Sequence, residues 1–183
     1  KNEDSVLIKV NVNNVETVYK GKIFFHSNPS IDLAILRLPE KLSKKKSLVY
    51  KDGPYSLGQE CLFLGYPLFN IGSLTKVGKI PFVKKAIVSA FYEKEGNELL
   101  LLDGHNNQGF SGGPVITTND KMENQFIIGV VSGYISQSQN LQINPVDKSD
   151  SLKYSLSINE NSGIIIAYPT RYIIEMINNL RQQ

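Results

Sequence analysis

This chain of 183 residues lacks cystines, long apolar runs and any strong imbalance of charge. Its single cysteine, Cys61, excludes an intramolecular disulfide, which leaves both the cytoplasm and a bacterial periplasm open as compartments. No apolar run approaches the roughly 18 residues that a membrane-spanning helix needs. The net charge of +3 is too small to indicate binding to nucleic acid. The hydrophobic content of 41% is ordinary for a soluble globular protein, so the chain can build a real core.

Two local features have plain explanations. The run Lys44-Lys45-Lys46 lies between serines and is typical of a solvated loop, with a basic docking patch as the alternative. Cys61 lies in a strand-like segment whose neighbours Glu60 and Leu62 point to the opposite face. We therefore predict a buried, unreactive thiol at Cys61 rather than a nucleophile.

Short apolar segments separated by Gly, Pro and Asn predict an all-β fold, a sandwich or a barrel. The expected strands span residues 6–12, 18–25, 33–38, 60–64, 85–91, 98–102, 115–117, 126–132 and 163–167. A Ser/Asn/Gln-rich stretch from 134 to 162 is too long for a simple hairpin, so we expect an elaborated surface loop with room for one strand at 152–158. Apolar residues repeat on one face after Pro169 and predict a single helix at the end of the chain.

The segment Gly109-Phe110-Ser111-Gly112-Gly113-Pro114 carries the strongest chemical signal. A nucleophilic serine needs a tight backbone bend that exposes Oγ, and two N–H groups aimed at the oxygen that becomes negative during acyl transfer. Glycine permits the bend and the close approach of a substrate. The alternative is a glycine-rich hairpin turn without chemistry.

The pattern Gly-x-Ser-Gly-Gly-Pro resembles the nucleophile loop of the trypsin-like, chymotrypsin-fold serine peptidases. Five further segments are similar to that family, and especially to its disulfide-free HtrA-type members, in the family's order along the chain: 32–38, 57–67, 86–90, 129–133 and 163–169. The resemblance implies an all-β fold, a double antiparallel β-barrel with a C-terminal helix at 170–181. It places a partial N-terminal barrel with the aspartate at 1–67, and a C-terminal barrel with the serine at 68–183.

The same resemblance implies the catalytic roles. Ser111 is the expected nucleophile, and the backbone N–H groups of Gly109 and Ser111 are expected to form the oxyanion hole. Asp32, which opens the apolar segment 32–38, is expected to orient a histidine and to stabilise its imidazolium form. Taken by its local sequence alone, Asp32 is a residue at a turn or at the start of a strand.

The resemblance also implies a substrate-binding set, which is His105, Gln108, Ser132, Gly133 and Tyr134. His105 replaces the carboxylate that gives trypsin its preference for Lys and Arg, so that preference is not expected here; a loop histidine without such a role is the alternative. Ser132 matches a position that supports the aspartate and contacts bound peptide, with an ordinary strand serine as the alternative. Tyr134 is expected to narrow the pocket, which favours small or polar residues before the cleaved bond.

Two departures from the family pattern stand out. Phe110 takes the place of the aspartate that pairs with a new N-terminal ammonium group in proteases activated by cleavage, so that activation is not expected. The family's order is His, Asp, Ser, yet His26 precedes Asp32 by only six residues and His105 follows it. We therefore expect neither histidine to be the catalytic base, and we expect that base upstream of Lys1.

Two functions remain open at this point. The first is a serine endopeptidase with a peptide or protein as its substrate, and the second is an inactive, protease-like module that binds peptides. The resemblance implies no metal, no organic cofactor, and neither nucleic acid nor a membrane as a partner.

Overall fold

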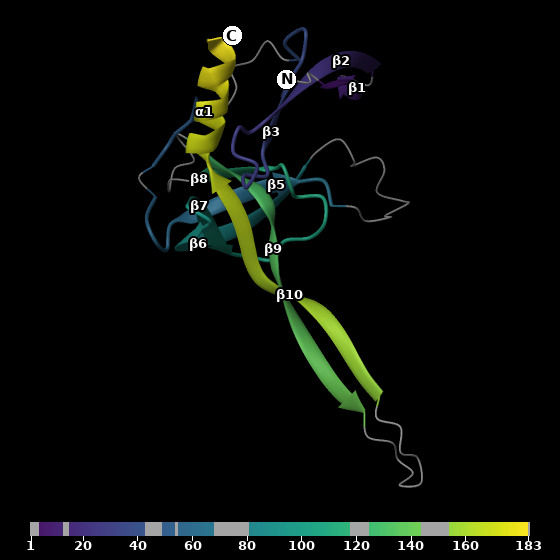
Figure 1. Cartoon of the computed structure of the whole chain (residues 1–183), viewed down its shortest axis with the longest axis vertical. Helices are drawn as coiled ribbons and strands as arrows, with labels where there is room; N and C mark the ends of the chain where they lie inside the picture. Colours follow the sequence, from purple (N-terminus) through teal and green to yellow (C-terminus); the bar gives the residue numbers. More distant parts are fainter. Residues whose placement is uncertain are drawn as a thin grey trace.

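The computed structural model describes residues 4–12, 15–42, 49–53, 55–67, 81–117, 125–143 and 154–182. Within these ranges the chain forms ten strands and one helix. The strands make two sheets, one of three and one of seven strands (Figure 1). The run Lys44-Lys45-Lys46 lies outside the described residues.

The smaller sheet is an antiparallel meander of β1 (Asp4–Val12), β2 (Val15–Phe25) and β3 (Ala34–Arg37). Its strands agree with the expected ranges to within a few residues. Alternation is visible in β1, where Val6 and Ile8 are half-buried while Leu7 between them is 76% exposed. The period of two that the sequence shows is therefore the period of the two sheet faces.

The larger sheet contains the remaining strands, in the spatial order β10-β7-β6-β5-β8-β9-β4. Their bounds are β4 (Val49–Tyr50), β5 (Glu60–Gly65), β6 (Phe82–Lys94), β7 (Asn97–Asp103), β8 (Pro114–Thr117), β9 (Phe126–Ile143) and β10 (Tyr154–Pro169). Strand β10 pairs with β7 on one side and with β9 on the other, so the sheet closes on itself. Closure removes the free edges that an open sheet would expose.

The core of the molecule belongs to this closed sheet and to the loop between β7 and β8. It contains Cys61, Phe63, Ala86, Val88, Leu100, Leu102, Phe110, Val115, Ile128, Val131, Ile165 and Ala167. Cys61 is fully buried, as the sequence predicted, and desolvation raises the pKa of its thiol to about 12. The thiol is therefore neutral at physiological pH and is shielded from reagents.

The fold is an all-β double antiparallel β-barrel with one C-terminal helix, and the three-stranded sheet represents its N-terminal barrel. Strand β5 pairs with β6 and β8, so it belongs to the larger sheet. The two sheets therefore divide between β3 and β4, earlier in the chain than residue 67. The division of the chain into folding units at 1–67 and 68–183 stays a prediction.

The expectation of a surface loop at 134–162 is wrong for most of its length. Strands β9 and β10 continue as one long hairpin, paired from Ser136↔Asn161 to Ile143↔Tyr154, and this hairpin projects from the body of the molecule (Figure 1). Polar side chains bridge the two strands, since Ser138 Oγ donates to Asn159 Oδ1 at 2.6 Å. The strand expected at 152–158 lies in β10 as far as its residues are described, from Tyr154 to Ile158. Its partner on β9 is mostly polar from Ser136 to Asn140, so the sequence pattern missed that half of the hairpin.

The helix α1 (Thr170–Arg181) follows Pro169, as predicted, and lies beside the smaller sheet (Figure 1). Arg171 in its first turn makes two hydrogen bonds to the Glu98 carboxylate on β7, at 3.0 and 3.1 Å. The Thr170 hydroxyl donates to the carbonyl of Ile127 on β9. These contacts fix the start of the helix against the larger sheet. None of the helical residues described forms a segment long and apolar enough to cross a membrane.

Candidate active site

Ser111 lies on an exposed turn between β7 and β8, and hydrogen bonds from both sides hold the turn. The Gly113 N–H donates to the Phe110 carbonyl at 2.9 Å and closes the turn around Ser111. The Gly112 N–H donates to the Val131 carbonyl at 2.7 Å, and the Val131 N–H donates back to the Gly113 carbonyl at 2.9 Å. The turn is therefore fastened to β9, while Ser111 itself is exposed to solvent.

Two glycines in this turn have no room for a side chain. Gly109 has φ +98°, and a Cβ there would lie 2.0 Å from the Tyr66 carbonyl oxygen. A Cβ on Gly113 would lie 1.8 Å from the Leu64 carbonyl oxygen. Both positions require glycine because the end of β5 packs directly against the turn. The sequence predicted the bend from these glycines, and the structure adds the close packing against β5.

The two N–H groups expected to form the oxyanion hole belong to Gly109 and Ser111. Neither donates a hydrogen bond to any group in the described part of the chain. The Gly109 carbonyl does have a partner, since it accepts a bond of 2.8 Å from the Tyr66 N–H. The Gly109 carbonyl is therefore tied to the residue that follows β5, and the role of the two N–H groups as an oxyanion hole stays a prediction.

Asp32 lies in the loop between β2 and β3. The His26 N–H donates to the Leu33 carbonyl at 3.0 Å and closes this loop. The Asp32 N–H donates to the Tyr168 hydroxyl at 3.1 Å, which ties the loop to the end of β10. The Asp32 carboxylate is exposed and makes no ion pair or hydrogen bond with any described residue. Backbone hydrogen bonds of the loop hold Asp32 in place, and its carboxylate oxygens accept no hydrogen bond from a described residue.

His26 is a packing residue between the smaller sheet and α1. Its side chain is buried, Nδ1 accepts a bond of 3.1 Å from the Asn28 N–H, and Nε2 lies 3.7 Å from Glu175 Oε2. The ring meets the Tyr172 ring edge-on, with 5.8 Å between centroids. Both ring nitrogens thus face groups other than Asp32 or Ser111. That His26 is not the base stays a prediction.

Lys84 on β6 supports the loop before Ser111, and sequence reasoning missed it. Its Nζ donates to the His105 carbonyl at 2.8 Å and also to Asn107 Oδ1, and it lies 5.2 Å from the centroid of the Phe110 ring. Desolvation lowers the pKa of this ammonium group from its ordinary value. The pair Lys84-Lys85 carries no chemical signal of its own in the sequence, and the structure shows that Lys84 meets the loop whereas Lys85 pairs with Glu60.

Asn106 is the second residue that the sequence did not reveal. Its side chain is 1% exposed, Nδ2 donates to the Gly133 carbonyl at 3.3 Å, and its own carbonyl accepts a bond from Asn161 Nδ2. Oδ1 of Asn106 has no partner among the described residues. The loop at 105–108 is therefore joined to both β9 and β10 by one buried residue.

The predicted substrate-binding residues lie in the two segments that Asn106 joins. His105 and Gln108 are exposed on the loop, Ser132 is half-buried on β9, and Tyr134 is 38% exposed at the start of the hairpin. Gly133 is the one member in direct hydrogen-bond contact with that loop among the described residues.

The predicted catalytic side chains are not hydrogen-bonded to one another. Among the residues that the structure describes, no hydrogen bond or ion pair joins the side chains of Ser111 and Asp32, and none joins either of them to a histidine. No group of three or more His, Cys, Asp or Glu side chains in the described ranges is placed to hold a metal ion. Within the described ranges the chain thus presents an exposed serine on an anchored turn, two N–H donors without a partner and a carboxylate without a partner.

A double β-barrel with a serine on a glycine-bounded turn defines the class of the chymotrypsin-fold peptidases. The family model of the trypsin-like peptidase domain matches residues 3–123, which is well over half of the chain. The chain belongs to this family.

Solved structures show the same fold at low sequence identity. The HtrA-type protease AlgW with a decapeptide is 20% identical, with a TM-score of 0.62, and the match covers 97% of this chain and 45% of AlgW. The active form of the Rv3671c protease from M. tuberculosis is 17% identical, with a TM-score of 0.59, over 93% of this chain and 61% of that one. A search of curated proteins returned no match. The chain thus spans less than half of AlgW and about three-fifths of Rv3671c.

Proposed function

We propose that this chain forms the serine- and aspartate-bearing part of a serine endopeptidase. In this proposal Ser111 attacks the peptide carbonyl, and the N–H groups of Gly109 and Ser111 bind the oxygen that becomes negative. Asp32 orients a histidine that lies upstream of Lys1, and that histidine takes the proton from Ser111 and later delivers it to the leaving amine. The observation that carries the proposal is the pair of unpaired N–H donors beside an exposed serine on a sterically fixed turn.

An open apolar face on the smaller sheet supports an upstream segment. Gly21 faces the side chains of Ile8 and Leu36, so these three residues share one face of the sheet. Phe25 lies on the same face by alternation, yet it is 67% exposed, and Leu36 is 43% exposed. Further strands that close this barrel would cover the face and would also bring a histidine to the unpartnered Asp32 carboxylate.

The proposed peptide-binding residues extend from the nucleophile turn along β9. We propose that an extended peptide lies along β9 at Ser132, Gly133 and Tyr134, with the side chain before the cleaved bond near His105 and Gln108. The solved structure of AlgW is one with a decapeptide, which supports a peptide as the ligand class. Small or polar residues before the cleaved bond fit a rim occupied by Tyr134. A profile of cleaved peptides dominated by Arg, Lys or Trp at that position would contradict this part.

A second function is favoured by the position of His26. That histidine packs against Glu175 and Tyr172, and no described base is hydrogen-bonded to the Ser111 hydroxyl. A serine hydroxyl without a base is a poor nucleophile at neutral pH. A peptide-binding module without activity is therefore the competing proposal.

The deciding experiment uses the full-length gene product with its upstream histidine. We expect a fluorophosphonate probe to label Ser111, and we expect Ser111→Ala to lower peptidase turnover by about 10⁴- to 10⁶-fold, with Asp32→Ala losing about 10⁴-fold. His26→Ala is the matched control, expected to stay within about threefold per folded molecule because a true base contributes roughly 10² or more. If the full-length protein neither labels nor cleaves any peptide pool, the binding module takes the place of the enzyme.

A further inference from the structure

The projecting hairpin leaves one edge of β9 without a strand partner in the described part of the chain. Strand β8 pairs with this edge as far as Val130, and the nucleophile turn occupies the next position through its two hydrogen bonds to Val131. Over residues 132–143 no described strand pairs with this edge, and Figure 1 shows the hairpin apart from the other strands. The edge therefore begins at the turn that carries Ser111 and runs outward.

Alternate residues of the hairpin direct their backbone groups to this edge. In an antiparallel pair the N–H and C=O of one residue point together, to the partner strand or away from it, and the two directions alternate along the strand. The Ile135 carbonyl accepts a hydrogen bond of 2.7 Å from Ser162 Oγ on β10, so the backbone of Ile135 faces β10. By alternation Ser136, Ser138 and Asn140 direct their N–H and C=O groups to the other edge, where no described strand takes them.

The sequence of this edge lacks the features that keep an exposed strand from pairing. Folded proteins protect such edges with charged side chains, with proline or with a very short strand. Residues 135–143 contain no charged residue and no proline. The one charged residue of β10 is Glu160, whose carboxylate accepts a hydrogen bond of 3.2 Å from Gln139 Nε2. An edge of this kind can take an extended peptide as an additional strand.

The direction of β9 decides which part of a substrate reaches this edge. The strand runs from the nucleophile turn toward the far end of the hairpin. A peptide that pairs antiparallel with β9 runs back toward Ser111, so the residues before the cleaved bond lie along the hairpin and those after it do not. From Tyr134 to Ile143 the strand rises by about 30 Å at about 3.4 Å per residue, which is room for about nine further residues of the peptide.

We propose that the β9 edge over residues 136–143 binds the more distant substrate residues before the cleaved bond, as one added antiparallel strand. The proposal rests on the peptide-binding role proposed for Ser132, Gly133 and Tyr134, and it extends that site outward. Bonds to the main chain of the substrate require an extended segment and select no single sequence. The exposed side chains at 136–140 are hydroxyls and amides, which favours an uncharged, polar segment beside them.

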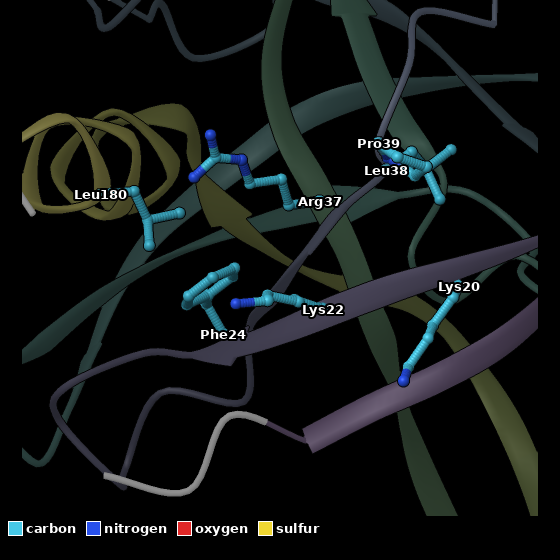
Figure 2. A pocket seen from close by; sticks show the side chains of 7 residues that line it. All are labelled: Lys20, Lys22, Phe24, Arg37, Leu38, Pro39 and Leu180. Carbon is cyan, nitrogen blue, oxygen red and sulfur yellow. The ribbon is translucent and has the colours of Figure 1, made fainter.

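A cavity of about 410 Å³ between the smaller sheet and the end of α1 is separate from this edge (Figure 2). It is lined by Lys20, Lys22, Phe24, Arg37, Leu38, Pro39 and Leu180. None of these residues belongs to β9 or β10, and α1 and the hairpin lie at opposite ends of the molecule (Figure 1). A ligand held in that cavity would therefore not respond to substitutions in the hairpin.

Binding is measured on the full-length protein with Ser111→Ala, so the result does not depend on cleavage. One fluorescein-labelled peptide has about six uncharged residues, and a second has about eight alternating threonines and glutamines added in front, enough to follow the hairpin. We expect the long peptide to bind at least about tenfold more tightly. This gain should change by less than about twofold between about 50 and about 300 mM salt, because the bonds join uncharged groups.

Backbone methylation of the long peptide tests whether it pairs as a strand. Two versions carry N-methyl groups on alternate residues of the added segment, in opposite phase. Only the phase whose N–H groups face β9 should lose the gain in affinity, because the other N–H groups point to solvent. This measurement leaves the protein unchanged.

Proline on either edge of the hairpin locates the added strand. Ser138 and Asn159 are Cα partners, so both direct their N–H groups outward, Ser138 to the proposed edge and Asn159 to the opposite one. Ser138→Pro should lose the gain of about tenfold, whereas the matched control Asn159→Pro should stay within about twofold. Both variants lose the hydrogen bond between the two side chains, so that loss cancels in the comparison.

Several results would overturn the proposal. They are equal affinity of the short and long peptides, equal effects of the two N-methyl phases, and an equal loss in the two proline variants. A dimer in sedimentation that Ser138→Pro dissociates and the long peptide does not would also overturn it, since a second copy of the chain would then occupy the edge.

Cleavage separates this proposal from the peptidase function. In the full-length protein that keeps Ser111, the added segment in front of the cleaved bond should raise kcat/KM by about tenfold, and the same segment behind it by less than about threefold. A larger gain from the segment behind the bond overturns the added strand. If neither peptide is cleaved while the long one binds with the expected N-methyl and proline effects, the peptidase function fails and the added strand is confirmed.

Discussion

The two sheets of this molecule differ in how much of their apolar surface they bury. All strand residues of the main buried cluster belong to the larger sheet, which closes through β10 and buries Phe63, Leu100 and Val131 almost completely. In the smaller sheet Leu7 and Phe25 remain 76% and 67% exposed. The proposed nucleophile therefore lies on a turn that packs against a fully buried core. The loop of the proposed triad aspartate is held by the hydrogen bond from the Asp32 N–H to Tyr168 of the other barrel and by bonds within the loop.

The same substitution in each sheet tests this contrast. Phe63→Ala should lower the free energy of unfolding by about 3–5 kcal/mol, because it leaves a cavity in a closed core. Phe25→Ala in the same 183-residue chain should cost less than about 1 kcal/mol, because the side chain is mostly in water already. Urea denaturation followed by circular dichroism measures both. Equal losses of unfolding free energy in the two variants, within the error of the measurements, would show that the two sheets do not differ in how far they bury their apolar side chains.

The pH dependence of the stability that Cys61 contributes tests whether the core of the larger sheet excludes solvent. The neutral thiol is favoured in the folded state, where burial raises its pKa from 9.0 to about 12. Its contribution to stability is therefore complete below the unfolded pKa and is lost as pH rises toward the folded one. The stability difference between the parent chain and Cys61→Ala should narrow by about 1.4 kcal/mol per pH unit in that window.

Chemical denaturation at several pH values above 9 measures the narrowing. Alkylation of Cys61 in the native state gives an independent check, since it should proceed only as fast as the protein opens. Rapid labelling of the folded protein, or a stability difference that does not change with pH, would place the thiol outside the sealed core.

Lys84 tests how firmly the nucleophile turn depends on the loop before it. Lys84→Met removes the bonds to His105 and Asn107, so in the full-length peptidase kcat should fall about tenfold while KM changes less than about twofold. Lys84→Arg, which keeps a cation and its donors, should restore most of the rate. Lys85→Met is the control, because Lys85 points to the other face and pairs with Glu60.

Hydrogen exchange separates a positioning role from general loss of stability. In Lys84→Met the amides of residues 104–112 should exchange faster while those of β5 and β7 keep their protection. Faster exchange throughout the larger sheet would mean that Lys84 supports the barrel as a whole. An unchanged kcat would show that the turn around Ser111 is held by its bonds to β9 alone.

Local patterns were enough to predict most of the architecture. Alternating apolar residues located β1, and the apolar repeat after Pro169 located α1, because both patterns follow directly from the period of the element. Strands β2 and β6 were located as extended apolar runs between turn residues. The turn at Ser111 was predictable since glycine and serine are the residue types that its geometry and its chemistry require. Burial of Cys61 was predictable because its neighbours Glu60 and Leu62 point to the opposite face of the strand, and Cys61 is fully buried in the structure.

The sequence by itself determined the succession of strands along the chain, the nucleophile turn and the family. Only the tertiary structure decided which contacts cross between elements. Strands β9 and β10 pair with each other from Ser136↔Asn161 to Ile143↔Tyr154, and β5 belongs to the larger sheet because its partners are β6 and β8. The contacts of Lys84 and Asn106 each join residues from different elements, and no local pattern encodes such pairings. These contacts depend on how the elements pack against one another, and that packing exists only in the folded chain.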